Sequence, residues 1–348
     1  MESVSTNLPL ILAPDLATGE VDRSLAVTTR SSTKNSVPAL PPPQRKGSIL
    51  FSLDENQELV DTWLSGLGDL DPMSDNHITQ CLSGFPSMSP EEMDRVQWVT
   101  ASEQLNEWLS PTRSCVLDLH SETAPDELVN AMSFCAATLA FSLARATQFA
   151  VLSFFCGIRT KESRKSTRSG PAAIRNSLNG QLLKFLLARQ AVDLSFLEQK
   201  KLMKKSQAEP KYARALLKKL FRVLPDRDVV FIMIDSFSSL GGTAVDYAKG
   251  DELIRELIDL GSEFPQLVIK LLVTDSLSNC PVRKLADQTL CVPDDVDGGA
   301  SGVNLQYLDG RKTVMIKQLA RKREEGSGSE SDDGSESSSS SSGSDLGW

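Results

Sequence analysis

Residues 229–235 constrain the fold most strongly, because six consecutive apolar residues run directly into an aspartate, Asp235. A strand with no polar alternation has to be covered on both faces, which is typical of a parallel sheet with helices packed on either side. The low aromatic content, 6% of the chain, fits an aliphatic core of this kind better than an all-β sandwich. The segment therefore predicts an α/β fold with Asp235 at the carboxyl edge of the sheet.

Similar apolar strands alternate with helical segments along the central part of the chain, as a parallel sheet with crossover helices requires. One helical segment begins with Pro171, a residue favoured at the first helical position. Residues 159–168 are basic and predict a surface loop. We expect further strands at residues 115–119, 149–155, 267–274, 289–292, 303–308 and 314–316, and helices at residues 127–145, 171–190, 211–224 and 251–260, the last ending at Gly261.

Short helices are expected before the first strand, at residues 54–67, after Ser89 and at 103–109. Ser89 is a typical N-cap, since Pro90 and the acid Glu92 follow it at the first and third helical positions. The two ends of the chain are too polar to bury the apolar surface that folding needs. The predicted organisation is a disordered Ser/Thr/Pro-rich segment at 1–50, a helical extension at 51–95, the α/β domain at 96–323 and a disordered acidic tail at 324–348.

Composition argues against several classes of protein. No stretch approaches the roughly 20 apolar residues that cross a bilayer, and the chain does not begin with a secretory signal pattern. The six cysteines form no C-x-x-C pair and the chain has only two histidines, which does not favour a zinc site. We therefore expect no membrane contact and no metal centre, buried cysteines in a reducing compartment, and a location in the cytoplasm or nucleus.

Charge is unevenly divided along the chain. Residues 47–160 carry four basic and sixteen acidic side chains, whereas residues 161–323 carry 28 basic and 19 acidic ones. The basic half lacks interleaved aromatic and glycine residues, which favours solvated faces over nucleic-acid binding. In the acidic tail, Ser327, Ser329 and Ser342 each precede an acid by three positions, a pattern that acidophilic kinases favour. Phosphorylation there would add further negative charge.

A series of short motifs runs through residues 96–292. Trp98 is followed ten residues later by Trp108-Leu109 and a short strand, then by the aromatic strand at 151–157, the strand ending in Asp235, and the Lys-to-Thr strand at 270–274. In this order the motifs resemble the nephrocystin-type NTPase domains of the STAND/NACHT class of P-loop proteins, which are abundant in fungi. The resemblance implies a P-loop NTPase-like three-layer fold with a mainly parallel sheet, and a site for ATP or GTP with magnesium.

The residues that would perform nucleotide chemistry are replaced. A phosphate loop needs glycines, a lysine and a Ser or Thr, but residues 119–127 read Leu-His-Ser-Glu-Thr-Ala-Pro-Asp-Glu. Each acid there would repel a triphosphate by on the order of 1–4 kcal/mol at contact distance. Two serines, Ser238 and Ser239, replace the family's acidic pair after Asp235, and Asp275-Ser276 replaces its Ser-Arg.

These replacements predict a non-catalytic P-loop-like module for interaction or signalling, with no catalytic residue, no cofactor and an unidentified protein partner. In a residual site for ATP or GTP with magnesium, Ser121, Thr123 and Asp235 would be the binding residues. The carboxylate of Asp235 is also explained as a cap on a neighbouring turn. His120 and Ser121 with Asp235 do not indicate a hydrolase, because the chain has no G-x-S-x-G elbow.

Two alternatives remain open. An unorthodox NTPase could bind magnesium through Asp235 and compensate for the missing lysine with Arg159 or Lys161. A nuclear regulatory protein could use the basic half to bind an acidic partner or nucleic acid, since the basic clusters at 311–312 and 321–323 resemble a split nuclear-localisation signal. The oligomeric state has no signature in the sequence.

Overall fold

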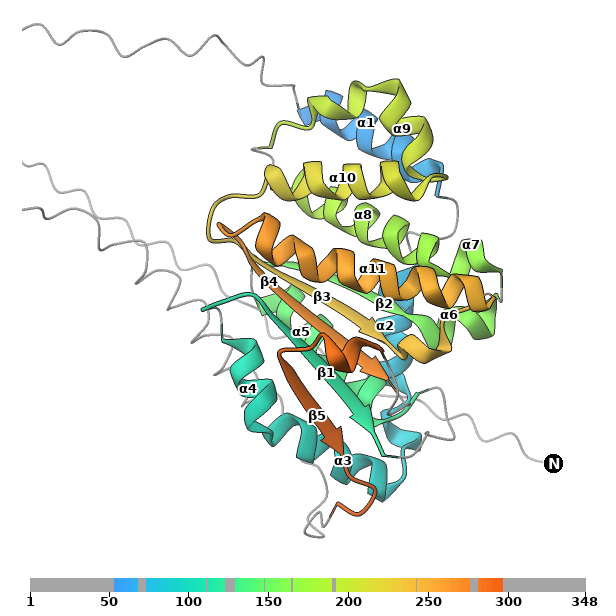
Figure 1. Cartoon of the computed structure of the whole chain (residues 1–348), viewed down its shortest axis with the longest axis vertical. Helices are drawn as coiled ribbons and strands as arrows, with labels where there is room; N and C mark the ends of the chain where they lie inside the picture. The colour runs from blue at the N-terminus through green and yellow to red at the C-terminus, as the bar shows by residue number, and fades with distance from the viewer. Residues whose placement is uncertain are drawn as a thin grey trace, which may run out of the picture. The chain divides into compact units, whose positions relative to one another are not determined.

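The protein has a five-stranded, all-parallel sheet with the strand order β2-β3-β4-β1-β5 (Figure 1). The strands are β1 (Cys115–Ser121), β2 (Ala150–Phe155), β3 (Val229–Asp235), β4 (Val268–Asp275) and β5 (Gln288–Val292). This computed structural model describes residues 53–67, 73–110, 112–122, 129–146, 148–163, 165–189, 192–241, 243–275 and 281–296.

The apolar strand β3 lies inside the sheet, and every one of its residues is buried. Alternate side chains enter two different cores: Val230, Ile232 and Ile234 on one face, Phe231 and Met233 on the other. A strand in this position has no solvent-facing side, which explains why its sequence shows no polar alternation. The predicted α/β class, with a parallel sheet and helices on both faces, is confirmed.

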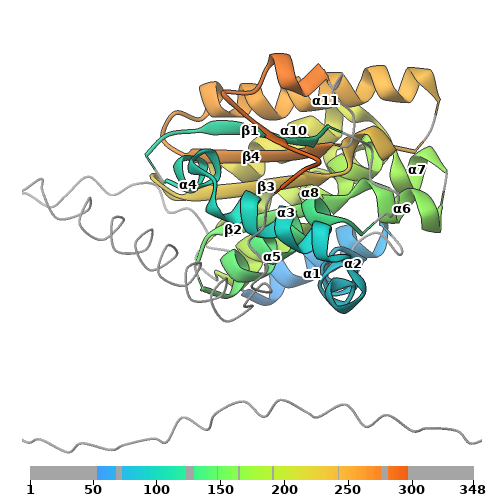
Figure 2. The same ribbon diagram turned by 90° about the horizontal axis from the view of Figure 1, so that it is seen from below.

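Helices cover both faces of the sheet and give the three-layer arrangement of a P-loop-like domain (Figure 2). One face is covered by α2 (Met73–Ser83), α3 (Pro90–Ala101), α4 (Glu103–Leu109) and α5 (Ala131–Ala146). The other is covered by α8 (Pro171–Ala188) and α11 (Ala244–Glu263), with α1 (Leu53–Ser65), α9 (Lys200–Ser206) and α10 (Pro210–Arg222) packed outside α8. Among the described residues, no helix is long and apolar enough to cross a membrane.

Several predicted elements need correction. The expected basic loop at 159–168 is wrong, since α6 (Cys156–Glu162) follows β2 directly and α7 (Ser166–Ser169) follows it. The expected C-cap at Gly261 is also wrong, because this glycine lies inside α11. That helix begins earlier than predicted because Thr243 and Asp246 form a capping box at its start. Helix α2 was not expected, and the predicted strands at 303–308 and 314–316 lie outside the described residues.

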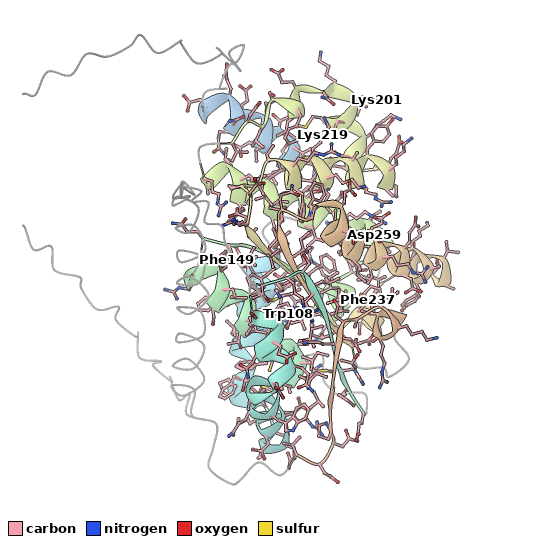
Figure 3. All side chains as sticks on the ribbon, turned by 60° about the vertical axis from the view of Figure 1, so that its left-hand side comes forward. Trp108, Phe149, Lys201, Lys219, Phe237 and Asp259 are labelled. Atoms are coloured by element: carbon pink, nitrogen blue, oxygen red, sulfur yellow. The ribbon has the colours of Figure 1, made fainter. Side chains whose placement is uncertain are left out.

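Trp108 joins α4 to the middle of the sheet. Its indole is fully buried, packs edge-on against Phe231 with ring centroids 5.6 Å apart, and donates from Nε1 to the carbonyl oxygen of Leu271 at 3.2 Å. Figure 3 labels Trp108 among the side chains of the domain. Because it combines a large apolar area with a satisfied N–H group, Trp108 is well suited to anchor a short helix that has few contacts of its own.

We expect Trp108→Ala to lower the free energy of unfolding by about 3–5 kcal/mol, because it opens a large cavity. Trp108→Phe keeps an aromatic ring but removes the donor to Leu271, and should cost about 1–3 kcal/mol. Urea unfolding followed by circular dichroism measures both values. As a control, Phe141→Ala changes a ring that is 42% exposed and should cost less than about 1 kcal/mol. Equal losses in all three variants would contradict the anchoring role.

Candidate functional site

The candidate site lies at the carboxyl edge of the sheet, where β1 and β4 are neighbours. The helix after β1, α5, covers one face, whereas the helix after β3, α11, covers the other. In open α/β sheets, ligands bind outside the carboxyl ends of the strands, where the connections change from one face of the sheet to the other. Asp235, at the end of β3, and Asp275, at the end of β4, belong to this edge.

Asp235 is buried and accepts hydrogen bonds from three hydroxyl groups. Thr274 Oγ1 donates to Oδ1 at 2.6 Å, and Ser133 Oγ and Ser236 Oγ donate to Oδ2 at 2.9 and 3.0 Å. These donors come from β4, from the first turn of α5, and from the residue after β3. The sequence predicted that Asp235 caps a neighbouring turn. Its carboxylate instead accepts from these hydroxyl groups and joins β3, β4 and α5.

Burial is the main influence on the ionisation of this carboxyl group. It raises the pKa of Asp235 above the ordinary value, against the three hydroxyl donors, which lower it, and Asp275 raises it a little more. The neighbouring Ser236 has a left-handed backbone, with φ of 53°, and donates its N–H to Thr274 Oγ1 at 2.9 Å. Such a conformation costs a non-glycine residue energy and is often found at functional sites.

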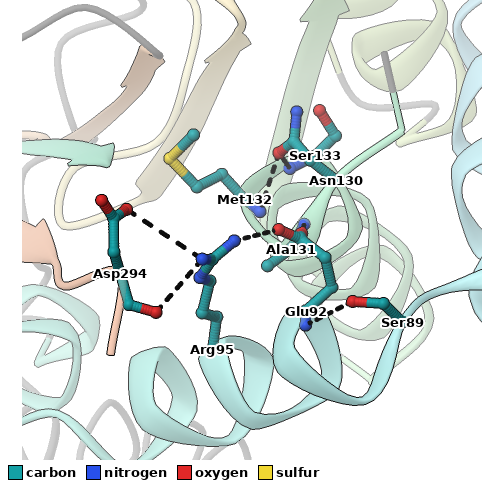
Figure 4. Close-up of polar contacts among 8 residues, drawn as sticks. All are labelled: Ser89, Glu92, Arg95, Asn130, Ala131, Met132, Ser133 and Asp294. Carbon is teal, nitrogen blue, oxygen red and sulfur yellow. Dashed lines mark hydrogen bonds and ion pairs between the residues drawn. The ribbon is translucent and has the colours of Figure 1, made fainter. Parts of the chain in front are cut away.

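The N-terminus of α5 points into the same region and is closed by side chains of the protein (Figure 4). Asn130, immediately before the helix, accepts through Oδ1 from the backbone N–H groups of Met132 and Ser133 at 3.0 and 3.1 Å. The N–H of Ala131 donates to a carboxylate oxygen of Glu92, which lies on α3. The N–H groups of the first three helical residues are thus all occupied by protein acceptors.

Arg95 holds the Glu92 carboxylate in this position. Its guanidinium donates to Glu92 Oε1 at 2.5 Å and to the carbonyl oxygen of Asp294, beyond β5, at 3.2 Å. Both partners are half-buried, with 22% of the Arg95 side chain and 20% of the Glu92 side chain exposed. A helix N-terminus favours an anion through its dipole and its N–H groups. Here Glu92 supplies that anion.

Ser133 is the functional candidate that sequence reasoning missed. In the pattern G-x-x-x-x-G-K-[ST], the final hydroxyl residue lies in the first turn of the helix after the first strand and shares magnesium with a strand-end aspartate. Ser133 has this place and contacts Asp235. Counted backwards from it, the lysine position holds Met132 and the glycine position before it holds Ala131. The signal available in the sequence was a serine in the first turn of the helix that follows the first strand. The assignment to residues 119–127 stays a prediction, because residues 123–127 lie outside the described part of the chain.

Ser121 ends β1 and is buried, but its register partner is Val292 of β5 and none of the hydrogen bonds of Asp235 involves it. Thr123 lies outside the described residues. The structure therefore brings Asp235 together with Ser133 and Thr274. The three residues proposed from the sequence do not form one cluster within the part of the chain that the structure describes.

His120 contacts Asp118, and not Asp235 as the hydrolase triad considered from the sequence would require. Its Nδ1 lies 3.1 Å from Oδ2 of Asp118, two residues earlier on β1, and both side chains are buried. Burial raises the pKa of Asp118, while the nearby imidazole lowers it. Because Asp235 bonds to hydroxyl groups elsewhere, the structure has no Ser121–His120–Asp235 triad.

The two basic residues named for an unorthodox NTPase lie on α6, beyond β2. Arg159 is buried with its guanidinium 5.2 Å from the ring centre of Phe154, and burial lowers its pKa to about 10. Lys161 is exposed. In the part of the chain that the structure describes, no group of three or more His, Cys, Asp or Glu side chains could hold a metal ion.

The chain matches no protein-family model and no curated protein by sequence.

The substitution Asp235→Asn tests whether the fold needs the negative charge of this buried carboxylate. Because the folded-state pKa of Asp235 is raised, its contribution to stability is greatest below the unfolded-state pKa and is lost as pH rises through the folded-state value. At pH 8 we expect the neutral amide to match or exceed the wild-type free energy of unfolding, by up to about 2 kcal/mol. The advantage should shrink toward pH 4.5. Urea titrations at both pH values measure it.

Asp275→Asn is the matched control, since it removes a buried carboxylate at the end of the neighbouring strand β4. A loss of stability on Asp235→Asn that grows with pH would contradict the interpretation, because it would show that the charge itself is needed in the fold.

Proposed function

We propose that the protein is a non-catalytic P-loop-like domain that acts as an interaction or signalling module. The observation that carries the proposal is the closed N-terminus of α5. Asn130 and Glu92 occupy the N–H groups with which such a helix would bind phosphate. A nucleotide would have to displace a carboxylate that Arg95 also binds.

Charge at the site supports the same proposal. The side chain at the lysine position, Met132, is apolar and buried, so it supplies no cation for a phosphate. Asp275, at the end of the neighbouring strand, adds a second buried carboxyl group beside Asp235. Without a compensating lysine, a triphosphate at this edge meets acidic groups in a poorly screened environment, where like charges repel most strongly.

Membership of the nephrocystin-type STAND/NACHT class is part of the proposal. It is supported by the order of the motifs along the chain and by their places in the fold: Trp108 packed against the sheet, Asp235 ending β3, and Thr274 one residue before the end of the neighbouring strand β4. By this interpretation the chain keeps the hydrophobic sheet of an NTPase and has lost its chemistry. The activity that remains is binding of a protein partner, in the cytoplasm or the nucleus.

The proposal predicts no stabilisation by Mg-ATP or Mg-GTP. A ligand present at 100 times its dissociation constant stabilises the folded state by about 2.7 kcal/mol, which shifts the Tm of a domain of this size by several degrees. With about 1 mM nucleotide and excess magnesium, we expect a shift below about 1 °C in differential scanning fluorimetry, and no release of phosphate.

Two variants make this result decisive. A Tm shift of several degrees that Asp235→Ala abolishes would overturn the proposal in favour of an NTPase that binds magnesium through Asp235. Glu92→Gln tests the closed helix N-terminus separately, because it removes the charge from the carboxylate site and keeps its shape. If Glu92→Gln alone restored a nucleotide-dependent shift, the Glu92 carboxylate would be the element that keeps nucleotide out.

A further inference from the structure

A strongly basic face covers the two helices α9 and α10, at the opposite side of the domain from α3 and α4. Residues 200–222 contain nine basic side chains and one acidic one, Glu209. Lys201 and Lys219, labelled in Figure 3, mark its two helices. We define the basic face by the nine residues Lys200, Lys201, Lys204, Lys205, Lys211, Arg214, Lys218, Lys219 and Arg222.

Only part of this charge is neutralised inside the domain. Arg214 and Lys218 form ion pairs with Glu256 and Glu263 of α11, and Lys205 pairs with Glu209. Within the described residues, five exposed members have no acidic partner: Lys200, Lys201, Lys204, Lys211 and Arg222. A concentration of unpaired cations on adjacent helices produces a positive potential that attracts a polyanion.

The aromatic rings of the face are already covered by cations. Lys201 and Lys205 lie 5.8 and 5.2 Å from the ring centre of Tyr212, and Lys219 lies 5.5 Å from that of Phe196. Proteins that bind single-stranded nucleic acid stack bases on open aromatic rings. Rings covered in this way leave charge as the main means of recognition, which fits an acidic peptide better than a nucleic acid.

The chain itself contains such a peptide. Residues 324–348 carry seven acidic and no basic side chains. The 27 residues from 297 to 323 connect this segment to the described domain, and a chain of that length reaches at most about 90 Å. This reach exceeds the roughly 30 Å length of α11, the longest of the described helices. A tethered segment also has an effective concentration on the order of millimolar, so weak contacts are enough for occupancy.

We propose that the acidic segment 324–348 binds the basic face of α9 and α10 in its own chain. The charges on the two sides are complementary, and the contact is electrostatic, so salt weakens it. Phosphorylation of Ser327 and Ser329 adds about −1.5 to −2 charges at each site and strengthens it. The face is then covered in the free protein and becomes available to another acidic partner only when the segment leaves.

The test uses the full chain with its own segment neutralised, so that a labelled peptide of residues 324–348 can be titrated onto it. In this tail-neutral chain the seven acids are replaced by their amides: Glu324→Gln, Glu325→Gln, Glu330→Gln, Asp332→Asn, Asp333→Asn, Glu336→Gln and Asp345→Asn. Fluorescence anisotropy should show saturable binding at about 50 mM salt, with an affinity at least about ten-fold lower at about 200 mM. The unmodified chain should bind the same peptide more weakly, because its own segment competes.

Charge reversal locates the binding surface. In the tail-neutral chain, K200E/K204E/K211E should lower peptide affinity by at least about ten-fold, because it reverses three exposed lysines without an acidic partner. The control K165E/K249E/K284E reverses three exposed lysines outside α9 and α10 with the same change in net charge. It should change the affinity by less than about two-fold. Circular dichroism confirms that both variants are folded.

Three results would overturn the proposal. The first is no peptide binding to the tail-neutral chain at low salt, and the second is equal loss of binding in the two triple variants. The third is that a single-stranded oligonucleotide of equal charge binds the face while the peptide does not, which would make it a nucleic-acid surface. None of these results depends on the nucleotide assay, so failure here is distinct from failure of the proposed function.

Discussion

The structure depends on covering both faces of one apolar parallel sheet. The middle strands β3 and β4 place alternate side chains in two separate cores, and each core needs its own layer of helices. This requirement explains why short helices before the first strand belong to the packed domain: Trp108 of α4 and Val96 of α3 fill the core on one side of the sheet, while Trp63 of α1 contributes to the other. Remote parts of the chain are thus joined by apolar burial, which has no directional requirement.

Polar groups at the carboxyl edge follow a stricter rule, because each buried donor or acceptor needs a partner. Around Asp235 and at the start of α5 this rule is satisfied within the protein, whereas His120 Nε2 and Asp118 Oδ1 on β1 are buried without a hydrogen-bond partner among the described residues. The hydroxyl groups of Ser133, Ser236 and Thr274 serve Asp235, and Asn130 with Glu92 serves the first turn of α5. A site organised for a ligand leaves such groups oriented toward it. Around Asp235 and at the start of α5 the groups are directed at one another, which is the physical basis for proposing a retained fold without the reaction.

The sequence predicted the sheet well because its strands are short apolar runs that only a buried parallel sheet accommodates. It predicted Asp235 for the same reason, as the residue that ends such a run. Ser133 was missed because a phosphate-loop pattern is recognised by its glycines and lysine, and residues 126–132 contain neither. Glu92 was identified only as a helix-capping acid. Its second contact, with the N–H of Ala131, depends on how α3 packs against α5, and no local pattern encodes that packing.

The bridge made by Arg95 has a consequence for how the domain forms. Arg95 contacts Glu92 three residues away, but its other partner, Asp294, is 199 residues further along the chain. Contacts of such separation are slow to form, since the chain between them has to be ordered first. During synthesis the ribosome releases β5 and Asp294 last among the described elements. The start of α5 therefore acquires its full set of contacts only after the whole sheet has been made, so the nascent domain passes through a stage in which this end of the helix is incompletely held.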